Sequence, residues 1–343
     1  MIPNISIIVP IYNCEMNLSK TLDSILNQTL ENIEILLVDA GSTDGSRKIM
    51  ETYKEKDPRI KLLIQENIEV NNAINSGIAE ASGNYIGIVY PNDLVDKNMY
   101  EIMCNEGIQS DCETVICDFN NSLSYVKALK NREVAEDNLV FDRPLILSEI
   151  CAELLMEGYI PSLCNKIYKK TMLINNNIFL RKEDNLPEDL LFNFEVINAS
   201  EKIVYIPEKF YYYGDTKEIL NQEYSKNVFE DSVKLYECKL KYYNLWNIKS
   251  EEIRLRMVLD FMRSIRHSIA NIFDTRNKDG FFQKTNYVYV VVNDPLVINS
   301  YQDYKKFNLE NNLDKSEKWV YKKIGSKSIF LLSLFYNFSN KEK

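Results

Sequence analysis

The chain has 343 residues, of which 45% are hydrophobic and 27% charged, and its formal net charge is −9. This is an ordinary globular composition, with room for two domains or for one domain with a helical extension. The acidic balance argues against a nucleic-acid partner, and seven scattered cysteines argue against both a disulfide framework and a zinc site.

Strands and helices alternate along the first hundred residues. Apolar runs predict strands at 5–10, 33–39, 60–64, 85–90 and 113–119. Between the first four runs, apolar residues recur at helical spacing. This alternation predicts a mostly parallel sheet that is covered on both faces by helices.

The pattern changes after residue 120. Helices are expected at 145–159 and 186–197, a strand that turns into a helix at 165–173, and a strand at 202–215. From residue 216 the chain is mainly helical, although 286–292 ("NYVYVVV") is typical of a strand or a buried segment. We therefore expect an α/β domain over 1–215 and a mainly helical region over 216–343.

Three loops follow predicted strands at the carboxyl edge of this sheet, where open α/β folds bind ligands. Their sequences are "IYNCE", "DAGSTDGS" and "YPNDLVD". None contains a GxGxxG or P-loop pattern, so a dinucleotide or P-loop site is poorly supported. The only histidine, His267, lies on a helix-patterned segment, so any catalysis must use carboxylates, Lys, Tyr, Ser or a metal.

Taken together, these segments resemble the family-2 glycosyltransferases. The resemblance rests on an ordered series: "SIIVPIYN", "LDSILNQTLENIEILLVDAGSTDGS", "DPRIKLLIQEN", "NSGIAEASGNYIGIV" and, much later, "PEDLLFN". It implies the GT-A fold, a Rossmann-like nucleotide-sugar-binding sheet flanked by helices. It also implies inverting transfer from a nucleotide-sugar, usually UDP-linked, to a glycan or glycoconjugate acceptor.

The family resemblance also assigns roles to single residues. Asp189, in "PED", matches the catalytic base that deprotonates the acceptor hydroxyl. The positions that match the donor nucleotide site are Pro10, Tyr12, Asp39, Gly41, Ser42 and Asn75. Asp93 matches the last acid of the family's metal-binding segment, in which an Asp-x-Asp pair holds Mn²⁺ or Mg²⁺ against the leaving diphosphate.

This chain departs from the family on the donor side. Tyr90 and Asn92 replace both acids of Asp-x-Asp, which leaves Asn92 and Asp93 as the metal-ligand candidates and makes a divalent cation doubtful. Ala40 stands where a second Asp is usual, and Gly214 where an Arg is common.

Each candidate also has a purely structural interpretation. Asp189 could stabilise a helix N-terminus, and Asp39 could cap the next helix. Lys166 is expected to be a surface lysine, and Tyr211 to Tyr213 are expected to be core or interface aromatics. The choice for Asp93 between a cap and a ligand stays open.

Three functional hypotheses follow. The first is an active inverting glycosyltransferase of surface polysaccharide or glycoconjugate biosynthesis. The second is a non-catalytic homologue that binds a glycan or partners an active transferase, which the donor-side changes favour. The third is an active enzyme with a different donor, such as a CDP- or GDP-linked sugar, which would explain Ala40.

The C-terminal segment differs in charge from the rest of the chain. Residues 315–343 contain seven lysines and two glutamates, a local charge of +5. Within it, 319–338 mixes lysines with apolar residues, which is typical of peripheral membrane contact or of a terminal helix docked on the helical region. We expect a cytoplasmic protein, acting at the inner face of the cell membrane if its acceptor is lipid-linked; the oligomeric state is left open.

Overall fold

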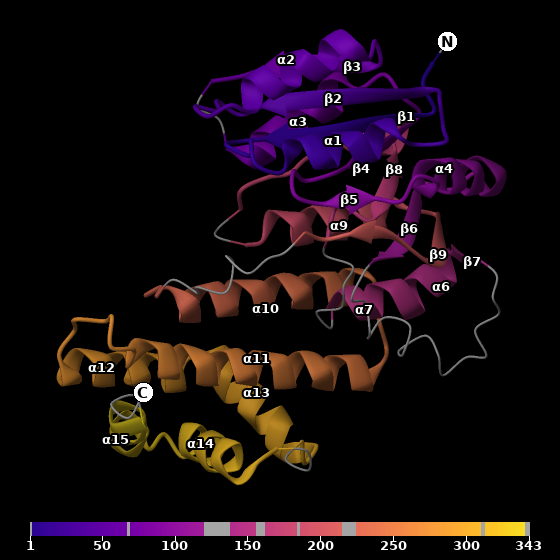
Figure 1. Cartoon of the computed structure of the whole chain (residues 1–343). Coiled ribbons are helices and arrows are strands. Elements are labelled where there is room, and N and C mark those ends of the chain that lie inside the picture. The colour runs from indigo at the N-terminus through magenta and orange to yellow at the C-terminus, as the bar shows by residue number, and fades with distance from the viewer. Residues whose placement is uncertain are drawn as a thin grey trace. The chain divides into compact units, whose positions relative to one another are not determined.

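The computed structural model describes residues 2–66, 69–119, 138–155, 162–183, 186–214, 224–309 and 313–339. The chain divides into two compact units (Figure 1). The first comprises 1–183 and 187–220, and the second comprises 184–186 and 221–343. All strands of the described residues lie in the first unit, and the second unit is helical.

Four strands on one side of the sheet run parallel, in the spatial order β3-β2-β1-β4. They are β1 (Ile5–Ile11), β2 (Ile33–Asp39), β3 (Ile60–Ile64) and β4 (Tyr85–Ile88). Every residue of β1, β2 and β4 is buried, which explains why these strands are continuous apolar runs. Ile11 pairs with Asp39, so β1 and β2 end at the same edge.

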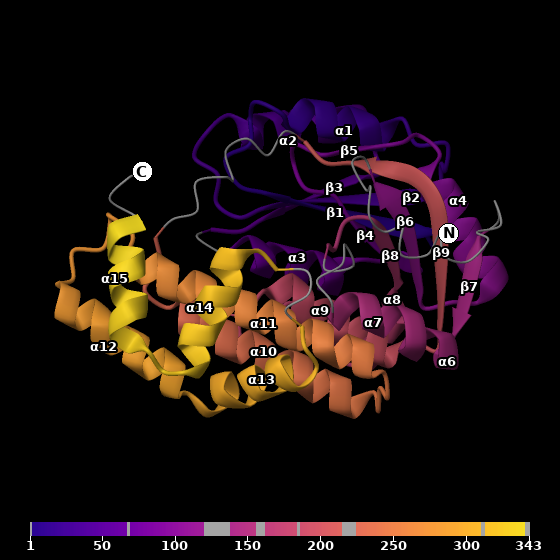
Figure 2. The same cartoon turned by 90° about the horizontal axis from the view of Figure 1, so that it is seen from below.

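The connecting helices cover both faces of these strands. They are α1 (Leu18–Leu26), α2 (Ser46–Lys56) and α3 (Val70–Glu80), followed after β4 by α4 (Met99–Ser110). Figure 2 shows α1 and α2 on one face of the sheet and α3 on the other. Helix α3 lies so close to β1 that a Cβ atom at Gly77 would be 2.6 Å from a methyl carbon of Ile8.

The remaining strands make the sheet mixed. They are β5 (Leu94–Val95), β6 (Thr114–Phe119), β7 (Leu139–Asp142), β8 (Lys166–Lys169) and β9 (Lys202–Tyr212). β8 runs antiparallel between β4 and β6, while β9 is parallel to β6 and antiparallel to β5 and β7. The α/β class is confirmed, with a sheet that is parallel on one side and mixed on the other.

Short helical segments complete the first unit. They are α6 (Arg143–Leu145), the π-helical η1 (Ile146–Ile150), α7 (Cys151–Leu155), α8 (Lys170–Asn175) and α9 (Glu188–Ala199). The predicted strand that turns into a helix is confirmed, because α8 follows β8 directly. Residues 156–159 of the helix expected at 145–159 lie outside the described residues.

A buried acid holds the amino edge of the parallel strands together. Glu34 on β2 accepts hydrogen bonds from Ser6 on β1, from the backbone and hydroxyl of Ser82, and from Lys61 on β3 at 2.5 Å. Although burial raises its pKa, these donors together lower the pKa of Glu34 to about 2. This network fixes three strands and the turn before β4 at the end opposite the candidate loops.

The second unit consists of six helices in the residues that the structure describes. They are α10 (Val228–Leu245), α11 (Glu251–Ile272), α12 (Phe281–Asn293), α13 (Pro295–Lys306), α14 (Lys315–Gly325) and α15 (Ile329–Ser339). The long apolar stripe expected on 253–272 is buried, including Phe261 and Ile265.

The segment 286–292 is helical, so its interpretation as a strand is wrong. Val288, Val291 and Val292 are buried, at positions i, i+3 and i+4 of α12. Packing of this stripe overrides the preference of valine for strands. On α14, Val320, Tyr321 and Ile324 are also buried, so the apolar side of this helix packs inside the second unit. No helix in the described ranges is long and apolar enough to cross a membrane.

Candidate active site

The loops after β1 and β2 form one surface at the carboxyl edge of the sheet. The backbone N–H of Ala40 donates to the carbonyl oxygen of Ile11 at 2.8 Å, and that of Asn13 donates to Oγ of Ser42 at 3.1 Å. Gly41 has a φ of 101°, a conformation that favours glycine. The predicted nucleotide-site residues Gly41 and Ser42 therefore shape the junction between these loops.

The other residues predicted to bind the donor nucleotide differ in their exposure and in their hydrogen bonds within the protein. Pro10 is buried inside β1, opposite Val38, whereas Tyr12 follows the strand with 53% of its surface exposed. The side-chain amide of Asn75 donates to the carbonyl oxygen of Leu180 at 2.8 Å and accepts from its N–H at 2.9 Å. Asn75 thus holds the segment around Leu180, and its contact with a nucleotide stays a prediction.

Asp39 is fully buried at the end of β2 and is neutralised by Arg47. The guanidinium of Arg47 donates to Oδ2 at 2.9 and 2.7 Å, and the N–H of Ser42 donates to Oδ1 at 2.9 Å. Burial raises the pKa of Asp39, but these partners outweigh it, so the net pKa is lowered. Arg47, 38% exposed, was not among the sequence candidates, and it places a cation beside the predicted donor loops.

Asp93 is held by the end of β9. Its Oδ2 accepts a hydrogen bond of 2.5 Å from the hydroxyl of Tyr211, and its Oδ1 accepts one of 2.9 Å from the N–H of Gly214. Burial raises its pKa despite these bonds. A Cβ atom at Gly214 would lie 2.4 Å from the carbonyl oxygen of Asn92, so a larger residue does not fit there.

The Asp-x-Asp positions offer poor ligands for a divalent cation. Burial raises the pKa of Tyr90 above its usual range, so this side chain stays a neutral phenol. Asn92 is exposed and offers a neutral amide, and both carboxylate oxygens of Asp93 are already bonded within the protein. In the described part of the chain, no group of three His, Cys, Asp or Glu residues could hold a metal. The donor set therefore does not fit Mg²⁺ or Mn²⁺.

Asp189 lies in the first turn of α9. The neighbouring Glu188 is bonded to the side chain of Asn71 on α3 at 2.5 Å, whereas no hydrogen bond reaches the Asp189 carboxylate from the described residues. Burial raises the pKa of Asp189 to about 6, a nearby Lys166 lowers it, and Glu188 raises it. An acid with this pKa is suited to accept a proton near neutral pH.

Lys166, at the start of β8, is buried with 1% of its surface exposed, so the expectation of a surface lysine is wrong. Its Nζ donates to the carbonyl oxygen of Ser162 and to Oδ1 of Asn165, the latter at 3.0 Å. Burial lowers its pKa to about 7, and Cys164, Cys117 and Asp189 partly offset this. The sequence gives no signal for this burial, because "NKIYKK" places lysines on both faces of a strand.

Aromatic side chains link these acids. Burial raises the pKa of Tyr90, and the charges of Asp189 and Asp93 raise it further, so this phenol lies within electrostatic reach of both acids. Tyr211 is fully buried, which confirms it as a core aromatic. The structure thus brings together residues from the β4 loop, β8, α9 and β9, while Asp39 and Arg47 lie at the end of β2.

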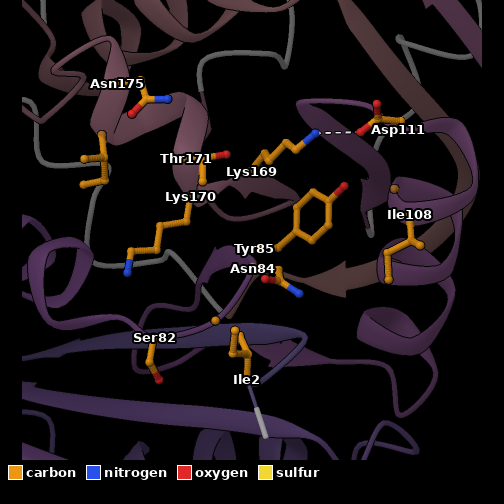
Figure 3. A pocket seen from close by; sticks show the side chains of 13 residues that line it. Ile2, Ser82, Asn84, Tyr85, Ile108, Asp111, Lys169, Lys170, Thr171 and Asn175 are labelled. Carbon is orange, nitrogen blue, oxygen red and sulfur yellow. Dashed lines mark hydrogen bonds and ion pairs between the residues drawn. The ribbon is translucent and has the colours of Figure 1, made fainter.

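A pocket of about 480 Å³ lies at the opposite edge, beside the first residues of β4 (Figure 3). Its lining includes Tyr85, Ile108 and Asn175, together with Lys169, which forms an ion pair with Asp111 at 2.7 Å. None of the residues that match the family's donor site or base lies in it. It is therefore separate from the candidate site.

Comparisons with known proteins point to one family. The model of "Glycosyl transferase family 2" matches residues 6–132. The "Uncharacterized glycosyltransferase EpsJ" of Bacillus subtilis (strain 168) is 31% identical over 252 residues, which is 72% of this chain and 72% of that protein. The "Putative glycosyltransferase EpsH" of the same organism is 29% identical over 299 residues, 86% of this chain and 84% of that protein.

Among solved structures, the fold is similar to that of S. aureus TarS residues 1–349 in complex with UDP-GlcNAc. The TM-score is 0.64 at 17% identity, and the match covers 99% of this chain and 92% of that one. At this identity the likeness supports the GT-A fold.

Proposed function

The chain belongs to glycosyl transferase family 2, and from this premise we propose that it is an inverting transferase that moves a sugar from a nucleoside diphosphate sugar to a hydroxyl group of a glycan or glycoconjugate. The observation that carries the proposal is the state of Asp189. This carboxylate is half-buried, lies within the electrostatic influence of Lys166 and accepts no hydrogen bond from the described residues, and burial raises its pKa to about 6.

In the proposed reaction, Asp189 removes the proton of the acceptor hydroxyl. The hydroxyl oxygen forms a bond to the anomeric carbon, and the bond from that carbon to the diphosphate breaks on the opposite side, which inverts the configuration. Glu188 is less suited to this role, because its carboxylate already accepts a hydrogen bond from the side chain of Asn71. A base whose pKa lies close to the working pH is both ionised and basic enough to assist the attack.

On the donor side, we propose that the loops after β1 and β2 bind the nucleotide. Tyr12 supplies an exposed ring, Gly41 and Ser42 shape the loop junction, and the Asp39–Arg47 pair fixes its floor. UDP-GlcNAc is bound by TarS, whose fold this chain shares, so UDP-linked sugars are the first donors to test. The proposed reaction has no metal-dependent step, because Tyr90, Asn92 and Asp93 are a poor ligand set for Mg²⁺ or Mn²⁺.

The proposed acceptor is a glycan of a surface polysaccharide or a glycoconjugate, including a lipid-linked glycan at the inner face of the cell membrane. The names of EpsJ and EpsH support a glycosyltransferase and state no acceptor.

The test separates binding from turnover. The wild-type chain and Asp189→Asn are titrated by calorimetry with UDP-, GDP- and CDP-sugars, with Mn²⁺ and with a chelator, and turnover is then measured on the donor that binds. We expect donor dissociation constants that agree within about threefold and a loss of turnover of about 10²–10⁴-fold in the variant. Glu188→Gln is the matched control and should keep most of the turnover.

Full turnover in Asp189→Asn would remove this residue as the base. Failure of every nucleotide to bind would instead support a non-catalytic glycan-binding homologue. Donor binding that requires Mn²⁺ would show that a cation site forms from groups other than those at 90 and 92.

A further inference from the structure

Two helices of the second unit, α12 and α15, lie side by side (Figures 1 and 2). The rings of Phe281 and Phe330 meet edge to face with centroids 6.4 Å apart, and Lys327 donates to Oδ1 of Asn293 at 2.9 Å. The start of α12 therefore contacts α15, and the end of α12 is bonded to the turn that precedes α15.

The two helices carry large apolar side chains that face solvent. These residues, which we call the aromatic face, are Phe282, Tyr289 and Val290 on α12 and Phe330, Leu331 and Phe338 on α15. Phe282 is 88% exposed, and Phe330 and Phe338 are each 61% exposed. On each helix the residues recur at helical spacing, so they lie on one side, opposite buried residues such as Val288 and Leu332. The exposed polar residues Gln283 and Asn286 lie on the same side of α12. A group of large exposed apolar side chains marks an interaction site.

The charged residues on α12, α14 and α15 are mostly lysines. Helices α12 and α15 together contain a single charged residue, Lys284. Helix α14, which contacts α15 through Trp319 and Phe335, carries four lysines, of which Lys315 and Lys322 are exposed. Residues 315–343 have a charge of +5 in a chain whose net charge is −9.

The acids next to this surface are already engaged. Glu317 pairs with Arg266 at 3.1 Å, and Asp279 pairs with Lys226 at 2.9 Å. Asp294 caps α13 by accepting from the N–H of Leu296 at 2.8 Å. Asp314, exposed beside Lys315, accepts from the N–H of Glu317 at 2.8 Å as the cap of α14. The four lysines of α14 therefore outnumber the acids of that helix and its cap.

We propose that the aromatic face and the lysines of α14 bind the surface of an anionic lipid bilayer, with α12 and α15 lying in its plane. Exposed aromatic rings enter the boundary between headgroups and acyl chains, and flanking ammonium groups are attracted to anionic headgroups. The helices have 13 and 11 residues, which suits lying on a membrane rather than spanning it. A second copy of the chain fits less well, because a symmetric contact would set the same lysines against each other.

This inference goes beyond the proposed function and does not depend on the donor or on Asp189. It keeps the part of the contact expected for 319–338 that falls on α15 and adds α12. The apolar residues Val320, Tyr321 and Ile324 of α14 take no part, because they are buried. Its test uses no turnover, so failure of either proposal leaves the other standing.

The test is co-sedimentation of the full chain with vesicles of phosphatidylcholine alone or with added phosphatidylserine. We expect binding to the anionic vesicles that weakens as salt is added. Phe282→Ser with Phe338→Ser, and separately Lys315→Glu with Lys322→Glu, should each reduce partitioning at least about tenfold. Leu245→Ser, a change at a 59% exposed residue on α10, is the matched control and should bind like the wild type.

Two results would overturn the proposal. One is equal binding of the wild type and both double variants. The other is no binding to anionic vesicles at low salt, together with a concentration-dependent dimer in sedimentation velocity that Phe282→Ser with Phe338→Ser abolishes. That second result would assign the surface to another copy of the chain.

Discussion

The hydroxyl of Tyr211 donates a hydrogen bond of 2.5 Å to Oδ2 of Asp93, although the two residues are 118 positions apart in the chain. The bond joins the loop after β4 to the end of β9. The N–H of Gly214 donates a second hydrogen bond, to Oδ1 of Asp93. Asp93, which matches the last acid of the family's metal-binding segment, therefore joins the loop after β4 to the end of β9.

Tyr211→Phe should destabilise the first unit. The change leaves a buried carboxylate with one of its two partners, which costs about 1–3 kcal/mol of unfolding free energy. Urea unfolding at neutral pH measures the effect. Tyr212→Phe, at the exposed neighbouring residue, should change stability by less than about 0.5 kcal/mol. A wild-type chain that Mn²⁺ stabilises, while Asp93→Asn is unaffected, would show instead that Asp93 is a metal ligand.

Glu34→Gln should weaken the amino edge of the sheet in a pH-dependent way. The folded-state pKa of Glu34 is lowered from 4.5 to about 2, so its stabilising effect is present above pH 4.5 and is lost as the pH falls toward 2. At neutral pH we expect a loss of about 1–3 kcal/mol, because the neutral amide bonds Lys61 and the serines less well.

Urea unfolding of Glu34→Gln and wild type between pH 7 and pH 3 checks this trend. The two curves should approach each other as the pH falls. Glu80→Gln, at an exposed residue, should follow the wild type throughout. A difference that is constant with pH would mean that the ionised form of Glu34 is not what stabilises this edge.

The first unit shows where sequence patterns are sufficient. β1, β2 and β4 follow from apolar runs, because parallel strands buried on both faces require apolar residues at nearly every position. The placement of Asp39 at a strand end follows from the same pattern. In the second unit, the helical spacing of Val288, Val291 and Val292 was a usable signal for α12, although the valines themselves favour a strand.

The partners of the site acids could not be predicted in this way. The burial of Lys166 depends on the position of β8 in the sheet, between β4 and β6. The residues around Lys166 in the sequence do not predict this strand order. Tyr211 meets Asp93 only because β9 crosses to β5. Such contacts between distant segments determine the pKa of Asp189 and the bonding partners of Asp93. These properties of the site could therefore not be predicted from the sequence.

Asp189→Asn should stabilise the chain at alkaline pH. The folded-state pKa of Asp189 is raised to about 6, so the stabilising effect of its protonated form is present below the ordinary value of about 4 and is lost as the pH rises through 6. Asparagine does not ionise, so the variant should be more stable by about 1–2 kcal/mol at pH 8.

Urea unfolding at pH 4 and pH 8 compares the two chains, with Glu188→Gln as the control. The gain of Asp189→Asn should shrink at pH 4. An equal gain at both values would indicate a packing effect rather than relief of a buried charge.

Lys166→Met should move the pH dependence of turnover. As the proposed base, Asp189 must be ionised to accept the acceptor proton, so we expect kcat of the wild type to fall below about pH 6. At that pH Lys166 still holds its proton, because its pKa is about 7, and its charge keeps the pKa of Asp189 from rising further. Methionine removes this charge at similar volume, so the acid limb should shift to higher pH by about one unit.

The midpoint of the acid limb is the informative quantity, since it does not depend on how much of the variant is correctly folded. Lys169→Met is the matched control, because Lys169 pairs with Asp111 at the opposite edge of the sheet, and its profile should coincide with that of the wild type. If the midpoint for Lys166→Met also coincides with that of the wild type, Lys166 does not set the charge state of Asp189. A shift in Lys166→Met alone would make Lys166 a positioning residue that acts through the base.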